Sequence, residues 1–183
     1  MNYVKLVLSG TYRETGIQKK GIASAAGKEG FRFDLFFLKV ENLIAKKNVK
    51  KVLVECRHDF SAGVFAGLEE ICERFETLKA AGKEVYFYAA AYGLQQLVLA
   101  SAASYRLIHP MGSVKFLGIA QSFSFMKNLM RKYGLEAEVF RRGSYKSAGD
   151  RFRTDRLEPP TREQYEFFQK SLMDSISSYL TKG

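Results

Sequence analysis

Residues 49–89 read VKKVLVECRHDFSAGVFAGLEEICERFETLKAAGKEVYFYA, and they are predicted to form a strand, a helix and a second strand. Residues 49–56 are short, apolar and rich in β-branched side chains, as in a buried central strand. Residues 64–81 place apolar side chains three and four positions apart on one helix face, and Gly82 ends the helix. A second apolar run covers 84–89. This order predicts a βαβ unit with two parallel strands.

The same alternation continues on both sides of this unit. It predicts strands over 3–9, 105–108 and 136–141, and helices over 31–47, 93–103, 123–133 and 161–180, the last begun by a capping box of Thr161 and Gln164. We therefore expect an α/β fold with a largely parallel sheet flanked by helices. Because no Pro-, Gly- or Ser-rich linker divides the chain, residues 1–183 are expected to form one domain, with a flexible surface loop over 11–30.

The composition is that of a soluble, folded protein. Hydrophobic residues make up 46% of the 183 residues and charged residues 26%. The longest apolar run, 85–94, is shorter than the roughly 20 residues that span a membrane, and no signal-peptide pattern opens the chain. Cys56 and Cys72 match neither a redox nor a zinc pattern and are expected to be reduced core thiols. The net charge of +10 is spread along the chain, which favours a solvated basic surface but is compatible with attraction to an anionic membrane.

Several short patterns are similar to functional motifs but lack the residues that those functions need. Residues 21–28 end in Gly-Lys like a phosphate-binding loop, but their glycines are one position too far apart, and Glu29 replaces the magnesium-binding Ser or Thr. Ser124 and Lys127 have SxxK spacing without the companion motifs. His58 and His109 are too isolated for a catalytic zinc or a serine triad. We therefore expect no metal, no cofactor and, without a nucleic-acid-binding signature, no nucleic-acid partner.

Residues 143–148 read GSYKSA, followed by Phe152 and by Leu-Glu-Pro at 157–159 before the last predicted helix. This segment resembles the Gly-x-Tyr-Lys-Ser-Ala lysine motif of the signal peptide peptidase A (protease IV) family. Weaker similarity, for example at 99–103 and 109–113, extends over essentially the whole chain. The resemblance implies a crotonase-like (ClpP-like) form of the α/β fold. It also implies a serine–lysine dyad in which Lys146 is the general base.

The surroundings of Lys146 are compatible with that role. A lysine amine has an ordinary pKa of about 10.4 and accepts a proton near neutral pH only if burial or a nearby cation lowers that pKa. Lys146 follows Tyr145 and precedes Ser147, a neighbourhood that an assembled cleft could desolvate, and Arg141 and Arg142 would act in the same direction. The alternative interpretation is a solvated lysine on a surface loop.

The chain departs from the family pattern at the nucleophile. Where the serine is expected, residues 94–98 read LQQLV, and no Ser or Thr lies between Ala90 and Ala100. The family's Gly-Gly pair, which supplies an oxyanion-hole N–H, is Ala62-Gly63 here, so the resemblance makes Gly63 a candidate oxyanion donor. The chain therefore resembles the N-terminal, lysine-bearing half of double-length members. A C-terminal domain or a partner subunit would supply the serine.

The leading functional hypothesis is half of a composite serine peptidase that cleaves remnant signal peptides or other short hydrophobic peptides. By resemblance, the natural full-length protein is an oligomer at the bacterial inner membrane, whereas this chain by itself is expected to be soluble and inactive. One alternative is a catalytically inactive scaffold of the same fold at a membrane. Another is a crotonase-type acyl-thioester enzyme, which holds an enolate with paired backbone N–H groups.

Overall fold

A computed structural model describes residues 3–13 and 31–182. The chain forms two compact units, which are described separately: the first comprises residues up to 117 together with those from 178 onward, and the second comprises residues 118–177. Because a compact unit need not be a separate domain, the expectation of one domain over 1–183 stays a prediction. No helix among the described residues is long and apolar enough to cross a membrane.

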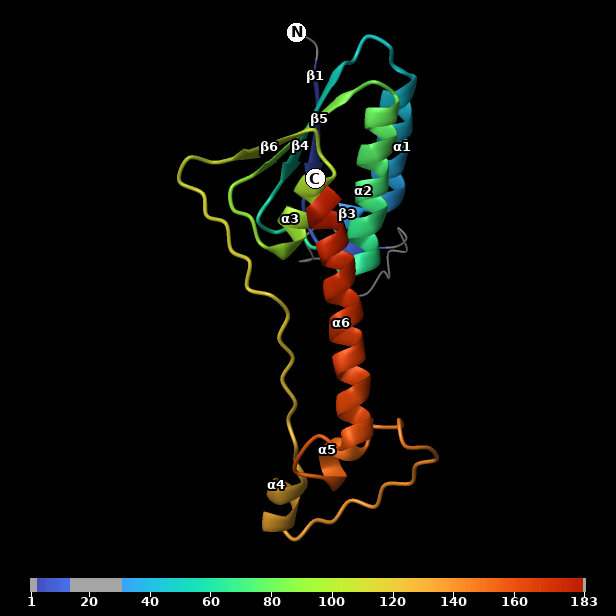
Figure 1. The fold of residues 1–183 in the computed structure, drawn as a ribbon, viewed down its shortest axis with the longest axis vertical. Coiled ribbons are helices and arrows are strands. Elements are labelled where there is room, and N and C mark those ends of the chain that lie inside the picture. The colour runs from blue at the N-terminus through green and yellow to red at the C-terminus, as the bar shows by residue number, and fades with distance from the viewer. Residues whose placement is uncertain (1–2, 14–30, 183) are drawn as a thin grey trace, which may run out of the picture. The chain divides into compact units, whose positions relative to one another are not determined.

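The first unit contains a four-stranded parallel sheet (Figure 1). Its strands lie in the order β1 (Tyr3–Leu8), β4 (Lys51–Cys56), β5 (Glu84–Ala89) and β6 (Tyr105–Ile108). The order in space equals the order along the chain, as successive crossover connections give when each places the next strand beside the last. The predicted α/β class with a parallel sheet and flanking helices is confirmed.

One face of the sheet forms the core. Along β4 and β5 every second side chain is buried, because successive residues of a strand point to opposite faces. Three helices supply the covering side chains: α1 (Phe33–Ala45), α2 (Phe65–Ala80) and α3 (Leu94–Ser101). The rings of Phe75 on α2 and Phe87 on β5, both fully buried, lie 6.3 Å apart. Burying each such ring stabilises the fold by about 1.5–3 kcal/mol.

A buried lysine joins the first helix to the second strand of the sheet. Lys83 is 5% exposed, and its Nζ donates hydrogen bonds to the carbonyl oxygens of Lys46 and Val49, each at 2.9 Å. Desolvation lowers the pKa of this amine. Lys83 follows Gly82, whose φ of 73° lets the chain turn back at the end of α2.

A short parallel pair accompanies the main sheet, formed by β2 (Tyr12–Arg13) and β3 (Phe31–Arg32). A flexible loop is expected over residues 11–30. Residues 14–30 lie outside the described part of the chain, and residues 12–13 form β2. The helix predicted over 31–47 begins at Phe33 because the two preceding residues form β3.

The second unit contains α4 (Lys127–Lys132), α5 (Asp150–Arg153) and most of α6 (Pro159–Lys182), which continues into the first unit. Figure 1 shows α4 and α5 near the first turns of α6. The strand predicted over 136–141 is wrong, since these residues have no regular secondary structure. Their apolar residues alternate, but no strand of the described part of this unit pairs with their backbone groups.

The predicted capping box is also wrong. Helix α6 begins at Pro159, so Thr161 lies inside its first turn rather than before it. Proline suits this place because its missing N–H would have no helical acceptor there. The hydroxyl of Thr161 instead donates a hydrogen bond to Oδ2 of Asp150, at 3.1 Å.

Candidate active site

Lys146 lies on the connection between α4 and α5. Gly143 has a φ of 98°, a conformation that glycine adopts without strain, and the chain turns there just before the lysine. The next turn is closed by the N–H of Ser147, which donates to the carbonyl oxygen of Tyr145 at 3.1 Å. Lys146 itself is exposed. This chain alone does not bury its amine, so the expectation that assembly desolvates Lys146 stays a prediction.

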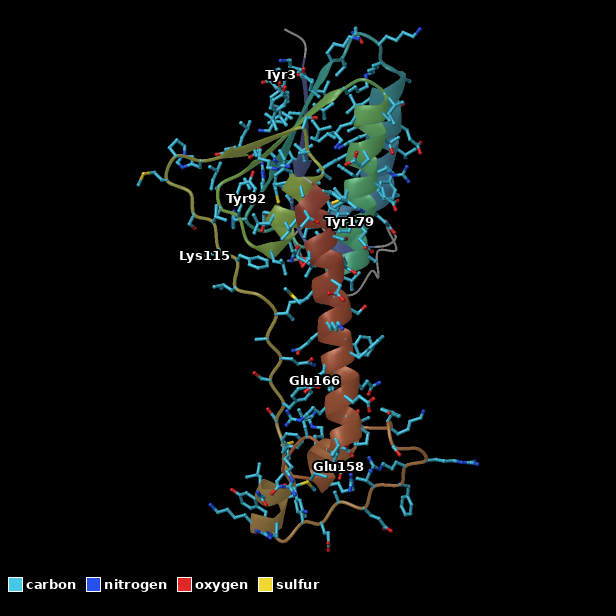
Figure 2. The ribbon with its side chains drawn as sticks, in the orientation of Figure 1. Tyr3, Tyr92, Lys115, Glu158, Glu166 and Tyr179 are labelled. Carbon is cyan, nitrogen blue, oxygen red and sulfur yellow. The ribbon has the colours of Figure 1, made fainter. Side chains whose placement is uncertain are left out.

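The side chain of Arg141 is engaged elsewhere. Its Nη1 donates to Oδ1 of Asp150 and its Nη2 to Oε2 of Glu158, both at 3.1 Å. Figure 2 shows Glu158 beside α5, at the chain segment that leads into α6. Two carboxylates therefore neutralise this guanidinium, and the expectation that Arg141 and Arg142 act on Lys146 stays a prediction.

A pocket of about 670 Å³ lies beside Lys146, within the second unit. Aromatic and basic side chains both line it, and none of the described residues that line it carries a carboxylate. The lining includes Phe140, Arg142, Tyr145, Lys146, Tyr165 and Phe168. Such a wall can contact an apolar side chain while a basic group faces the same space.

In the first unit, two glutamines follow Leu94, the residue at which the resemblance leads us to expect the family's serine. Helix α3 begins at Leu94, directly after Gly93. Oε1 of Gln95 accepts the backbone N–H of Ala62 at 3.2 Å, and Oε1 of Gln96 accepts the N–H of Gly93 at 3.1 Å. The side-chain amides at this helix start therefore bind backbone donors that face them.

The N–H of the candidate oxyanion donor, Gly63, also has a hydrogen-bond partner. Gly63 has a φ of 74°, and its N–H donates to Oγ of Ser61 at 3.3 Å. Gly63 belongs to the first unit and Lys146 to the second. The role of Gly63 as an oxyanion donor stays a prediction. The SxxK spacing has no helical basis, because Ser124 lies outside α4, which begins at Lys127.

The two thiols are core residues, as expected. Cys56 is 4% exposed and Cys72 is 2% exposed. Burial raises the pKa of Cys56 to about 11 and that of Cys72 to about 12. Neither is therefore a ready nucleophile, since the thiolate is the reactive form. Within the described residues, no group of three or more His, Cys, Asp or Glu residues could hold a metal ion.

Sequence reasoning did not single out Gln95 or Asp150. The partner of Gln95 is 33 residues away in the sequence, and the two guanidinium partners of Asp150 become evident only when the loop is folded. The one available signal for Asp150 was an acidic residue shortly after the lysine motif, within a strongly basic segment.

Comparison with known proteins identifies the family. The model of peptidase family S49 matches residues 77–182, which is more than half of the chain and includes both α3 and the Lys146 segment. This chain belongs to peptidase family S49. The predicted relationship to protease IV is thereby confirmed.

Relatives of this S49 chain include three proteins with protease names. Protease 4 of Salmonella typhi is 27% identical over an alignment that covers 81% of this chain and 24% of the relative. The chloroplastic serine protease SPPA of Arabidopsis thaliana is 32% identical over 62% of this chain and 16% of the relative. Protease 4 of Haemophilus influenzae is 29% identical over 66% and 19%. The chain therefore spans a quarter or less of the length of these relatives.

Proposed function

We propose that this S49 chain is the lysine-bearing half of a composite serine–lysine peptidase. The observation that carries the proposal is the GSYKSA segment, which presents Lys146 on an ordered loop beside an aromatic pocket. The serine position of the same chain is occupied by Leu94, and the adjacent Gln95 engages a backbone donor. The chain thus offers a base and lacks its own nucleophile at that position.

In the proposed reaction, the serine belongs to a C-terminal domain or a partner subunit. Neutral Lys146 Nζ takes the proton of the serine hydroxyl as its oxygen attacks the peptide carbonyl, which forms a tetrahedral oxyanion. The protonated lysine then gives this proton to the leaving amine as the C–N bond breaks. The serine oxygen stays bonded to the acyl group as an acyl-enzyme. A water molecule then gives a proton to Lys146 Nζ as it attacks this ester, and the lysine returns the proton to the serine oxygen as that C–O bond breaks and the second product leaves.

The substrates that fit this site are short peptides with apolar side chains, such as remnants of signal peptides. Phe140, Tyr145, Tyr165 and Phe168 line the pocket beside the base, and apolar walls favour apolar ligands. Attraction of the chain, with its net charge of +10, to an anionic membrane surface would bring it to such substrates. The S49 assignment and the parallel sheet support a crotonase-like form of the fold.

Exposed rings in the second unit support assembly with another domain or subunit. Phe140 is 88% exposed, Phe167 71% and Phe168 61%. Phe140 lies on the connection between α4 and α5 and lines the same pocket as Phe168 of α6. Large exposed apolar side chains that gather on one surface mark places that another protein covers. A covering partner at this surface would also remove water from the neighbouring Lys146.

One observation favours a second candidate function, a catalytically inactive scaffold. The N–H groups of Ala62 and Gly63, at the place of the family's Gly-Gly pair, are both bound to side chains of this chain. A scaffold binds no oxyanion, so it does not need these N–H groups to be free and can keep such contacts. The same contacts count against an acyl-thioester enzyme, which needs free paired N–H groups for its enolate.

A pair of assays separates these functions. The isolated chain, incubated with a fluorogenic hydrophobic peptide and a serine-directed fluorophosphonate, is expected to show neither turnover nor labelling. Addition of a serine-bearing S49 domain should produce both. Turnover by the isolated chain would show that a serine has been overlooked, and silence in the mixed sample would favour the scaffold. Binding of coenzyme A would instead favour the acyl-thioester enzyme.

A further inference from the structure

A buried carboxylate follows Lys146 closely in the sequence. The side chain of Asp150 is 6% exposed. Its Oδ1 accepts hydrogen bonds from Arg141 at 3.1 Å and from Arg153 at 3.2 Å, and its Oδ2 accepts one from Thr161 at 3.1 Å. Burying a carboxylate is costly unless it is paired and hydrogen-bonded, and here both oxygens are satisfied.

A second carboxylate completes the cluster. Oε2 of Glu158 lies 3.1 Å from Nη2 of Arg141 and 2.6 Å from Nη2 of Arg153. Two guanidinium groups and two carboxylates therefore neutralise one another. Arg141 uses both ends of its planar fork to join the two carboxylates, which a lysine ammonium cannot do in the same geometry.

Packing of the Val139 side chain against Gly149 brings the same two segments together. A Cβ atom added at Gly149 would lie 2.4 Å from Cγ1 of Val139, so the residues before Arg141 and Asp150 already touch. The residues between Arg141 and Asp150, 142–149, form a loop that this ion pair closes at its base. Lys146 lies within this closed loop.

Two further bonds hold the part of the loop around the lysine. The hydroxyl of Tyr145 donates to Oε2 of Glu163 on α6 at 3.0 Å. The N–H of Asp150 donates to the carbonyl oxygen of Ser147 at 2.9 Å. The residues on either side of Lys146 are thus fixed, although its own side chain is exposed.

We propose that Asp150 and Arg141 are positioning residues that hold the Lys146 loop in one conformation, with Arg153, Glu158 and Thr161 as their supports. The catalytic consequence rests on the proposed function, because position matters for catalysis only if Lys146 is the base. A general base must be held to within a fraction of an ångström of its working place, and an untied loop of this length would instead sample many conformations.

Amide hydrogen exchange of the isolated full chain tests the proposal. In Asp150→Asn, we expect the amides of Ser147 and Asp150 to exchange at least about tenfold faster than in the wild type, because bonds to a charged group are lost. Amides of β4 and β5 should change by less than about twofold, since local opening leaves the rest of the fold closed. The matched control is Asp155→Asn, which removes an exposed carboxylate on the following segment. This variant should change amide exchange neither in the loop nor in β4 and β5.

Conservative variants separate positioning from general stability. Asp150→Glu keeps the negative charge, so the amides at positions 147 and 150 should exchange more slowly in this variant than in Asp150→Asn. If Asp150→Asn does not fold, Arg141→Lys carries the test, because it keeps the charge and loses the bridge between the two carboxylates. Unchanged loop exchange would overturn the proposal, and so would an equal acceleration in β4, β5 and the loop. These readouts require no peptidase activity, so a failure here is distinct from a failure of the proposed function.

Discussion

Replacing Gln95 with alanine tests whether its side-chain amide, at the start of α3, holds the backbone N–H of Ala62. The N–H of Ala62 would lose its acceptor at a residue that is 1% exposed. A hydrogen bond contributes about 0.5–1.5 kcal/mol, and a fully buried unpaired donor costs about 1–3 kcal/mol. Gln95 is half-buried, so water can reach the N–H that the substitution exposes, and the cost should lie at the lower end of these ranges. Alanine also favours the helix by a few tenths of a kcal/mol. We expect a net loss of about 0.5–1 kcal/mol.

The assay is urea denaturation followed by circular dichroism, with the wild type and Gln95→Glu in parallel. Glutamate keeps an acceptor oxygen and places a negative charge near the helix start, which is worth about 0.3–1 kcal/mol. The Glu variant should therefore be more stable than the Ala variant. An unchanged slope of the free energy of unfolding against urea would show that the difference lies in stability. If Gln95→Ala were as stable as the wild type or more stable, the Gln95 carboxamide would not hold the N–H of Ala62, and this reasoning would be wrong.

Three further predictions concern the core and the Lys146 loop. Because burial raises the pKa of Cys72 to about 12 and of Cys56 to about 11, iodoacetamide at pH 8 should label them only after unfolding, and rapid labelling of the native chain in a mass spectrum would contradict this. The hydrogen bond from Arg153 lowers the pKa of Glu158 in the folded chain. The stability that ionised Glu158 contributes to the fold is therefore fully present above the unfolded pKa of about 4.3, and it is lost as pH falls through the lower folded pKa. The amide NMR signals of the loop should therefore shift during acid titration below about pH 4, and an unchanged spectrum down to pH 2 would refute the expectation. Gly149→Ala should cost about 1–3 kcal/mol in urea unfolding through its clash with Val139, and Val139→Ala in the same chain should recover much of that loss; equal stability of the single variant would show that the contact yields freely.

The first unit could be predicted from its sequence because its elements bury side chains with a regular period. The strand predicted over 84–89 has the same bounds in the structure, and the helix predicted over 64–81 is found over 65–80. In both, the period of apolar residues reflects one sheet or helix face packed against the core. Glycine at the end of α2 gave a boundary as well, since its positive φ serves the turn.

The helix predicted over 161–180 is found as α6 over Pro159–Lys182, but the rest of the second unit resisted prediction because its order comes from polar contacts between distant residues. Residues 136–141 alternate like a strand, but a strand needs a neighbour, and Arg141 instead binds two carboxylates. The motif alone located Lys146, by resemblance. The ion pairs that fix its loop join residues whose local sequence carries no periodic signal, so neither Asp150 nor Glu158 could be assigned a partner in advance.

The central claim is that Lys146 acts as a general base, and substitution by arginine tests it most directly. The measurement is kcat/KM for a hydrophobic fluorogenic peptide, made with the chain joined to a serine-bearing S49 domain. Loss of a general base costs about 10²- to 10⁴-fold, and guanidinium stays protonated, so Lys146→Arg should lose nearly as much activity as Lys146→Ala. Lys127→Ala, at the accidental SxxK spacing, should remain close to wild type. Retention of more than about a tenth of the wild-type rate by Lys146→Arg would show that this residue supplies charge or position and would contradict the account.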